Sequence, residues 1–220
     1  MKIAQAIVKQ DLHTTPHERV DLILEKMEQM GYQALPVVDE GAFQGLLRLD
    51  KLRTIEDRTH KLEFYNLIYE QVYIFEDRHL FDALPLFVSH SINVLPVINT
   101  EHQYIGMVDA QNLIAATNEI LDCERPGSVL VLELGQRDNA LSHIAHIVES
   151  ANAQILSSFT RFLPDSSQIE ITLKINTITL SDVVTSLLRY DYQVKSTYSL
   201  EMDREDINAR YEHLMNYINM

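Results

Sequence analysis

The sequence has little cysteine, no tryptophan and no long apolar run. Cys123 is the only cysteine among 220 residues, which excludes a disulfide framework or a multi-thiolate zinc site within one chain. No run of about 18 apolar residues occurs, and this argues against a membrane span. The apolar stretch after Met1 is too short for a signal peptide. These absences predict a reduced, cytoplasmic protein without a membrane partner.

Basic residues are also scarce relative to acidic ones. Eighteen Lys and Arg stand against 32 Asp and Glu, for a net charge of −14, and the basic residues form no cluster. Such a field repels a phosphate backbone, so no nucleic-acid partner is expected. The acid excess is interpreted as a solubilising surface. The apolar fraction of 46% is ordinary for a globular protein, and the length fits one large or two small domains.

An internal repeat organises the first half of the chain. A shift of 60 residues places Leu35–Val38 on Leu95–Ile98, and after one inserted residue Gly45 falls on Gly106. Apolar residues coincide along most of the two copies. The pattern in each copy predicts a strand, a helix, two strands and a second helix.

Local signals set the expected helix ends. Thr15 can cap the first helix, with Pro16 at its first position and Glu18 completing a capping box. Gly31 is expected to end this helix. Pro85 is expected to kink the corresponding helix of the second copy or to delay its start.

The repeated unit resembles the CBS domain. An apolar strand with proline, a polar turn and a glycine-led strand occur in both copies, as Ala34–Asp39 with Gly45–Leu47 and Val94–Asn99 with Gly106–Val108. The resemblance implies an α/β (α+β) fold with a tandem CBS pair of two β-α-β-β-α units, over residues 1–60 and 61–122. It also implies a regulatory role.

The second half changes pattern after the turn-rich break Glu124–Ser128. Residues 128–200 read as strand, helix, strand, strand, helix and strand, with alternating apolar positions over Gln168–Ile175. This βαββαβ order is ferredoxin-like, and it resembles the ACT domain, a small-ligand regulatory module. Together the halves resemble the acetoin-utilisation (AcuB) type of bacterial regulatory protein. A terminal helix is expected over 201–220, packed on its own sheet or at a dimer contact.

The CBS resemblance implies a ligand cleft between the two units. CBS pairs usually bind adenine nucleotides, with the adenine against the strand edge, here Ala34 to Pro36 or Val94 to Pro96. AMP, ATP and S-adenosylmethionine are the candidate ligands. No cofactor is certain from the sequence.

The family's glycine-led strand normally continues to a Ser or Thr three residues on and an Asp six residues on, which accepts hydrogen bonds from ribose. This chain carries Arg48 and Lys51 there in the first copy, and Asp109 and Asn112 in the second. Lys51 has no acceptor for a ribose hydroxyl, but with Arg48 it can attract an anion. Asp109 would repel a phosphate, and Asn112 can accept one hydroxyl. The alternative is a solvated strand end and helix start.

The ACT resemblance implies a second ligand site, in the loop after the first strand of that unit. There Arg137 would hold a carboxylate of an amino acid and Gly135 would let it approach, while Asn139 stands where the family has glycine. The alternative is a plain capped helix start. His143 and His146 share a helix face, but no further ligand is near in sequence, so no metal site is expected.

Two functional hypotheses follow. The first is a non-catalytic regulatory sensor that binds a small ligand and signals to an unknown protein target. The second is a ligand-free oligomerisation scaffold with degenerate CBS sites. A homodimer is expected in both. An enzyme is not expected, because no acid/base pair, activated nucleophile or metal cluster can be assembled from the sequence.

Overall fold

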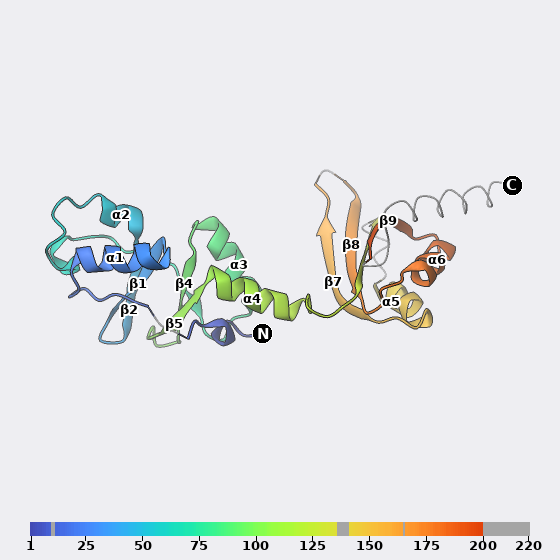
Figure 1. Ribbon diagram of the computed structural model, residues 1–220, viewed down its shortest axis with the longest axis horizontal. Helices are drawn as coiled ribbons and strands as arrows, with labels where there is room; N and C mark the ends of the chain where they lie inside the picture. The colour runs from blue at the N-terminus through green and yellow to red at the C-terminus, as the bar shows by residue number, and fades with distance from the viewer. Residues whose placement is uncertain (10–11, 136–140, 165, 200–220) are drawn as a thin grey trace. The chain divides into compact units, whose positions relative to one another are not determined.

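The computed structural model describes residues 1–9, 12–135, 141–164 and 166–199 (Figure 1). The chain divides into two compact units, one ending at Ile120 and one beginning at Leu121. Both units combine helices with sheets, so the chain has the predicted α/β (α+β) fold. The predicted C-terminal helix over 201–220 lies outside the described residues.

The first unit contains both copies of the repeat. Its elements are η1 Ile3–Ala6, α1 Val20–Met30, β1 Ala34–Asp39, β2 Ala42–Arg48, α2 Leu49–Arg53, η2 Leu62–Phe64, β3 Ile74–Phe75, α3 Leu80–Ser89, β4 Val94–Ile98, β5 Tyr104–Asp109 and α4 Ala110–Ile120.

The two hairpins of the first unit have equivalent registers. Ala34 pairs with Arg48 in β1–β2, and Val94 pairs with Asp109 in β4–β5, with a bulge at the same place in each. In the second copy β3 adds a parallel strand to β4. In the first copy that strand is reduced to one parallel bridge, between Thr14 and Val37. The predicted repeat is thus present down to individual strand partners.

Thr15 does not cap the first helix, so that prediction was wrong. Helix α1 begins at Val20 without a side-chain cap. The Glu18 carboxylate, expected to turn back to the backbone, instead accepts hydrogen bonds from Thr14 Oγ1 at 2.8 Å and from Lys26 Nζ at 3.0 Å. The Glu18 N–H donates to the Thr15 carbonyl at 3.2 Å, so residues 15–18 form a turn that precedes the helix.

The other helix signals had mixed outcomes. Gly31 ends α1 as predicted, in the left-handed conformation with φ of +68°. Pro85 does not delay the second copy's helix, because α3 already begins at Leu80 and continues through the proline. His79 caps α3, with its ring nitrogen accepting from the Phe81 N–H at 3.2 Å.

Each glycine-led strand is crossed by a segment that precedes the other copy of the repeat in the sequence. Glu70, in the linker after the first copy, makes both backbone hydrogen bonds with Leu46 of β2. Val8, near the N-terminus, donates its N–H to the Met107 carbonyl of β5 at 2.9 Å. The N-terminal segment also contributes to the core of the second copy, because Ile3 is fully buried in a cluster with residues of that copy.

The close crossing explains the two glycines. Gly45 has φ of +141°, and a Cβ added there would lie 2.5 Å from Tyr69 Cβ. At Gly106, with φ of +154°, it would lie 2.7 Å from Ile7 Cγ2. Both the backbone conformation and the lack of space therefore require glycine at these positions.

The second unit contains one four-stranded antiparallel sheet with two helices on one face (Figure 1). The strand order is β7-β8-β6-β9, which is the predicted ferredoxin-like βαββαβ arrangement. Its elements are β6 Ser128–Gly135, α5 Leu141–Ser150, β7 Ile155–Phe162, β8 Gln168–Ile175, α6 Ser181–Arg189 and β9 Gln193–Tyr198.

Alternation in β8 confirms the predicted core face. The side chains of Ile169, Ile171, Leu173 and Ile175 are at most 1% exposed and pack in one cluster with residues of α5 and α6. Between them, Glu170 points to the opposite face of the sheet and is only 6% exposed. A buried carboxylate requires compensating partners.

Candidate functional site

The cleft predicted from the CBS resemblance begins where the two hairpins start. The Asn93 side chain joins the copies here: its Oδ1 accepts from the Gln33 N–H at 2.9 Å and its Nδ2 donates to the Gly31 carbonyl at 2.8 Å. Ala34 and Val94 follow directly in β1 and β4, which are in contact. The structure therefore brings the two predicted strand edges together.

Arg48 ties the first copy to the second. Its Nη1 donates to the His90 carbonyl at 2.9 Å, at the C-terminal end of α3, and lies 3.5 Å from the Ser91 carbonyl. A guanidinium at a helix C-terminus satisfies free carbonyls and interacts well with the helix dipole. Arg48, predicted as a solvated or anion-binding residue, thus joins the two copies by a hydrogen bond.

Asp109 makes the reciprocal tie from the second copy. One carboxylate oxygen accepts from the Asn112 N–H at 2.7 Å, which caps the start of α4. The other accepts from the Tyr32 hydroxyl at 3.2 Å, next to the end of α1. Burial, and then the Asp109 carboxylate, raise the pKa of Tyr32, so this hydroxyl stays a donor. Asn112 also donates to the Ala6 carbonyl at 3.2 Å.

The remaining residues that were predicted to contact a ligand in the cleft are either exposed or buried. Lys51 is exposed on α2, one turn beyond Arg48, and its ammonium has no ion-pair partner within the described part of the chain. The strand-edge residues Ala34, Pro36, Val94 and Pro96 are all buried. The Pro36 carbonyl accepts the Thr14 N–H at 2.9 Å. An adenine at this edge would have to contact backbone that is already packed.

The sequence did not predict these hydrogen bonds between the two copies, although it contained one signal for them. Tyr32 and Asp109 are 77 residues apart, and Gln33 and Asn93 are 60 apart, so no local pattern links them. However, Gln33 and Asn93 are equivalent positions of the repeat. A polar residue directly before each buried strand suggests a contact near the pseudo-symmetry axis of the pair.

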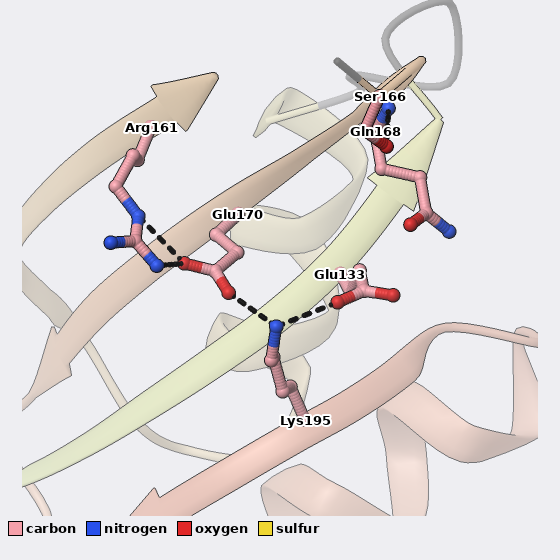
Figure 2. A network of polar contacts seen from close by, with 6 residues as sticks. All are labelled: Glu133, Arg161, Ser166, Gln168, Glu170 and Lys195. Carbon is pink, nitrogen blue, oxygen red and sulfur yellow. Dashed lines mark hydrogen bonds and ion pairs between the residues drawn. The ribbon is translucent and has the colours of Figure 1, made fainter. Parts of the chain in front are cut away.

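The second unit carries a row of four charged side chains across the open face of its sheet (Figure 2). Glu133 and Glu170 are direct neighbours on β6 and β8, an unfavourable pairing of like charges. Lys195 Nζ resolves it by binding both, at 2.8 Å and 2.5 Å. On the other side Arg161 Nε donates to Glu170 at 2.9 Å. The hydrogen bonds from Lys195 and then Arg161 lower the pKa of Glu170.

The Glu170→Gln variant is expected to lose less stability on acidification than the unaltered chain. A lowered folded-state pKa means that the carboxylate stabilises the fold above the ordinary Glu pKa of about 4.3, and that this contribution is lost as pH falls through the lower folded value. Urea unfolding between neutral pH and pH 3 measures how steeply the free energy of unfolding falls with pH. Exposed Glu149 of α5, changed to Gln, is the control. Equal slopes for both variants would contradict this role.

Gly135, the described residue of the predicted ACT-loop site, lines a cavity. The cavity is about 360 Å³ in volume and its wall includes Glu133, Gln168, Tyr190, Asp191 and Tyr192. Arg137 and Asn139 lie outside the described residues. His143 bonds through Nδ1 to the Tyr192 hydroxyl at 2.8 Å. Among the described residues, no three His, Cys, Asp or Glu side chains gather as a metal would require.

The chain thus contains two copies of a helix, a β-hairpin and a second helix, joined by side-chain hydrogen bonds and followed in sequence by a ferredoxin-like unit. The second copy has an additional opening strand, β3, where the first copy has a single bridge. Residues 68–119, which contain most of the second copy, match the family model of the CBS domain. No helix in the described ranges is long and apolar enough to cross a membrane.

Similar proteins cover about half of the chain. Inosine-5'-monophosphate dehydrogenase of Methanocaldococcus jannaschii is 25% identical over 114 residues, which are 51% of this chain and 23% of that enzyme. The chain thus spans less than a quarter of the length of this relative.

Two solved structures align with roughly the same share. A CBS domain pair/ACT domain protein from Thermotoga maritima has a TM-score of 0.49 and 23% identity, covering 55% of this chain and 99% of that chain. CBSX2 in complex with AMP has a TM-score of 0.44 and 19% identity, covering 54% of this chain and 97% of that chain.

Proposed function

We propose that this chain is a non-catalytic regulatory protein whose CBS pair binds an adenine nucleotide through its phosphate, at Arg48 and Lys51. The observation that carries the proposal is the different environment of the Lys51 ammonium and the Arg48 guanidinium. Lys51 is exposed without an ion-pair partner in the described residues, while Arg48, one turn away, holds the end of α3. A phosphate between them would gain two charge-assisted contacts.

This arrangement supplies a route from binding to signalling. A phosphate that draws the Arg48 guanidinium would compete with the His90 carbonyl, and so would weaken a tie between the copies. Binding and the arrangement of the two copies are then linked, because the ligand favours the state in which Arg48 is released. The change would be passed to an unknown protein target.

AMP is expected to bind more tightly than adenosine by about tenfold, and Lys51→Ala to remove that difference, since one charge-assisted hydrogen bond contributes about 1.5–3 kcal/mol. Isothermal titration of AMP, ATP, S-adenosylmethionine and adenosine measures both effects. Arg53→Ala is the matched control, because Arg53 lies on the same helix but pairs with Glu28. Absence of heat with every ligand, or equal affinity for AMP and adenosine, would refute the proposal.

A second candidate is a scaffold that needs no ligand. Two residues of the second copy favour this scaffold. Asp109 and Asn112 both make hydrogen bonds within the chain, at positions where the family resemblance implies contacts to a nucleotide. Excess absorbance near 260 nm in the purified protein would count against this candidate. Amino-acid binding by the ACT-like unit is a further alternative, and the cavity beside Gly135 is its one support.

A further inference from the structure

A groove of about 290 Å³ lies between the edge strand β3 and helix α3 of the second copy. Its wall consists of the six residues Tyr73, Ile74, Phe75, Arg78, Asp82 and Leu86. Phe75 pairs with Ile98, at the end of β4 opposite to Val94, so the groove lies about 13 Å along the sheet from the cleft predicted for a nucleotide. None of the residues predicted to contact a nucleotide is among the six.

The first copy fills the equivalent position with an ion pair. Glu18 and Lys26 stand there at the repeat positions of Arg78 and Leu86. The Lys26 ammonium lies 2.9 Å from the Glu18 carboxylate and also donates to the His13 carbonyl at 3.2 Å. One ammonium thus satisfies a carboxylate and an outward-facing strand carbonyl at the same time.

The second copy cannot form this pair, because Leu86 carries no charge. Arg78 and Asp82 are both exposed, and within the part of the chain that the structure describes neither side chain has an ion-pair partner. They do not pair with each other. The Tyr73 carbonyl, which is the repeat equivalent of the His13 carbonyl, receives no side-chain hydrogen bond from the described residues. The groove therefore offers a cation, an anion and a carbonyl that remain available to a ligand.

Aromatic rings form an apolar wall beside these polar groups. The rings of Tyr73 and Phe75 are in edge-to-face contact, with centroids 5.6 Å apart. The Tyr73 ring also contacts Phe43 of β2 at 5.8 Å and His102 at 5.9 Å. Tyr73 and Phe75 are half-buried, so packing fixes their rings while one side of each stays accessible. Together with Leu86 they supply apolar contact area for a ligand.

We propose that this groove binds a free α-amino acid with an aromatic or large aliphatic side chain. The carboxylate of the ligand pairs with Arg78, and its ammonium binds Asp82 and the Tyr73 carbonyl, as the Lys26 ammonium binds the equivalent groups of the first copy. The ligand side chain packs on the aromatic rings. A peptide is a poorer fit, because its N-terminal residue has no free carboxylate and its C-terminal residue has no free ammonium.

The groove is separate from the other two candidate sites. Its wall contains neither Lys51 nor Gly135. Lys51→Ala is therefore expected to leave amino-acid binding unchanged while it removes the phosphate contact of AMP. For the same reason, failure of the amino-acid site would leave the proposed nucleotide site untouched, and the reverse also holds.

Isothermal titration of the full chain with L-phenylalanine and L-leucine tests the site. Phenethylamine lacks the carboxylate and 3-phenylpropionate lacks the ammonium, and each is expected to bind at least about tenfold more weakly than L-phenylalanine, because each loses a charge-assisted contact. Arg78→Gln is expected to weaken L-phenylalanine by at least about tenfold and to leave phenethylamine unchanged. Arg53→Gln is the matched control, since Arg53 is exposed but pairs with Glu28, and it should bind like the unaltered chain.

A double variant closes the groove with the side chains of the first copy. Arg78→Glu with Leu86→Lys places the Glu18–Lys26 pair in the second copy, so that the new ammonium occupies the place of the ligand. Circular dichroism establishes that the variant is folded, and no binding of L-phenylalanine is expected. Unaltered binding in this variant, or in Arg78→Gln, would overturn the proposal and place the amino acid elsewhere. Absence of heat with both amino acids and the unaltered chain would also overturn it.

Discussion

Replacing Gly45 with alanine is expected to destabilise the first unit by about 3 kcal/mol or more. The methyl group would lie 2.5 Å from Tyr69 Cβ and 3.2 Å from the Glu70 carbonyl, both fixed to the backbone of the crossing segment. Overpacking costs about 1–3 kcal/mol, and a left-handed conformation costs an alanine a further 1–2 kcal/mol or so. Relaxing the contact would break the two hydrogen bonds between Glu70 and Leu46.

Gly41→Ala separates the two effects. Gly41 also has a positive φ, of +83°, but no atom lies within 4 Å of an added Cβ. This variant should therefore lose only the backbone contribution, about 1–2 kcal/mol. Urea unfolding followed by far-ultraviolet circular dichroism measures both variants on the full chain. If Gly41→Ala and Gly45→Ala lost the same stability, the crossing segment would not be packed on β2 as described.

Restoring the family pattern in the second copy should raise affinity for AMP by at least about tenfold. The double variant Asp109→Thr with Asn112→Asp places a hydroxyl three residues after Gly106 and a carboxylate six residues after it. The carboxylate can accept hydrogen bonds from ribose, and charge-assisted bonds of this kind contribute about 1.5–3 kcal/mol. Removing the Asp109 charge ends its repulsion of a phosphate, and threonine still caps α4.

The gain comes with a loss of stability. Tyr32 loses its carboxylate partner, and the Ala6 carbonyl loses the Asn112 amide; each lost bond costs on the order of 1 kcal/mol. Titration calorimetry with AMP gives the affinity. Gln111→Asp adds the same charge one residue away, on the exposed side of α4, and should not increase binding. An unchanged affinity in the double variant would mean that the cleft is closed for reasons other than these two side chains.

The strands could be predicted from the sequence because their determinants are local. Gln168–Ile175 alternates between apolar and polar residues, and the structure places β8 over the same eight residues. The equivalence of Gly45 and Gly106 likewise predicted the matched hairpins. Helix starts were harder to predict. The Glu18 carboxylate accepts hydrogen bonds from Thr14 and Lys26, and not from the backbone at the helix start as the capping pattern predicted.

The site could be predicted only in part, because its polar residues act at long range. The sequence identified Arg48 and Asp109 as unusual for the CBS pattern. It did not show that each binds the other copy, since His90 is 42 residues from Arg48 and Tyr32 is 77 residues from Asp109. Ala34 and Pro36 are both buried in the structure, and their expected contact with a ligand stays a prediction.

The exchange of crossing segments has a consequence for the making of the protein. The first hairpin is not complete until Glu70 has left the ribosome, and Val8 must wait for Met107, about one hundred residues later. At roughly 5–20 residues per second, translation leaves the apolar N-terminal segment without its partner for on the order of 5–20 seconds. During that time Ile3 and Ile7 lack the second-copy residues that they contact in the folded chain.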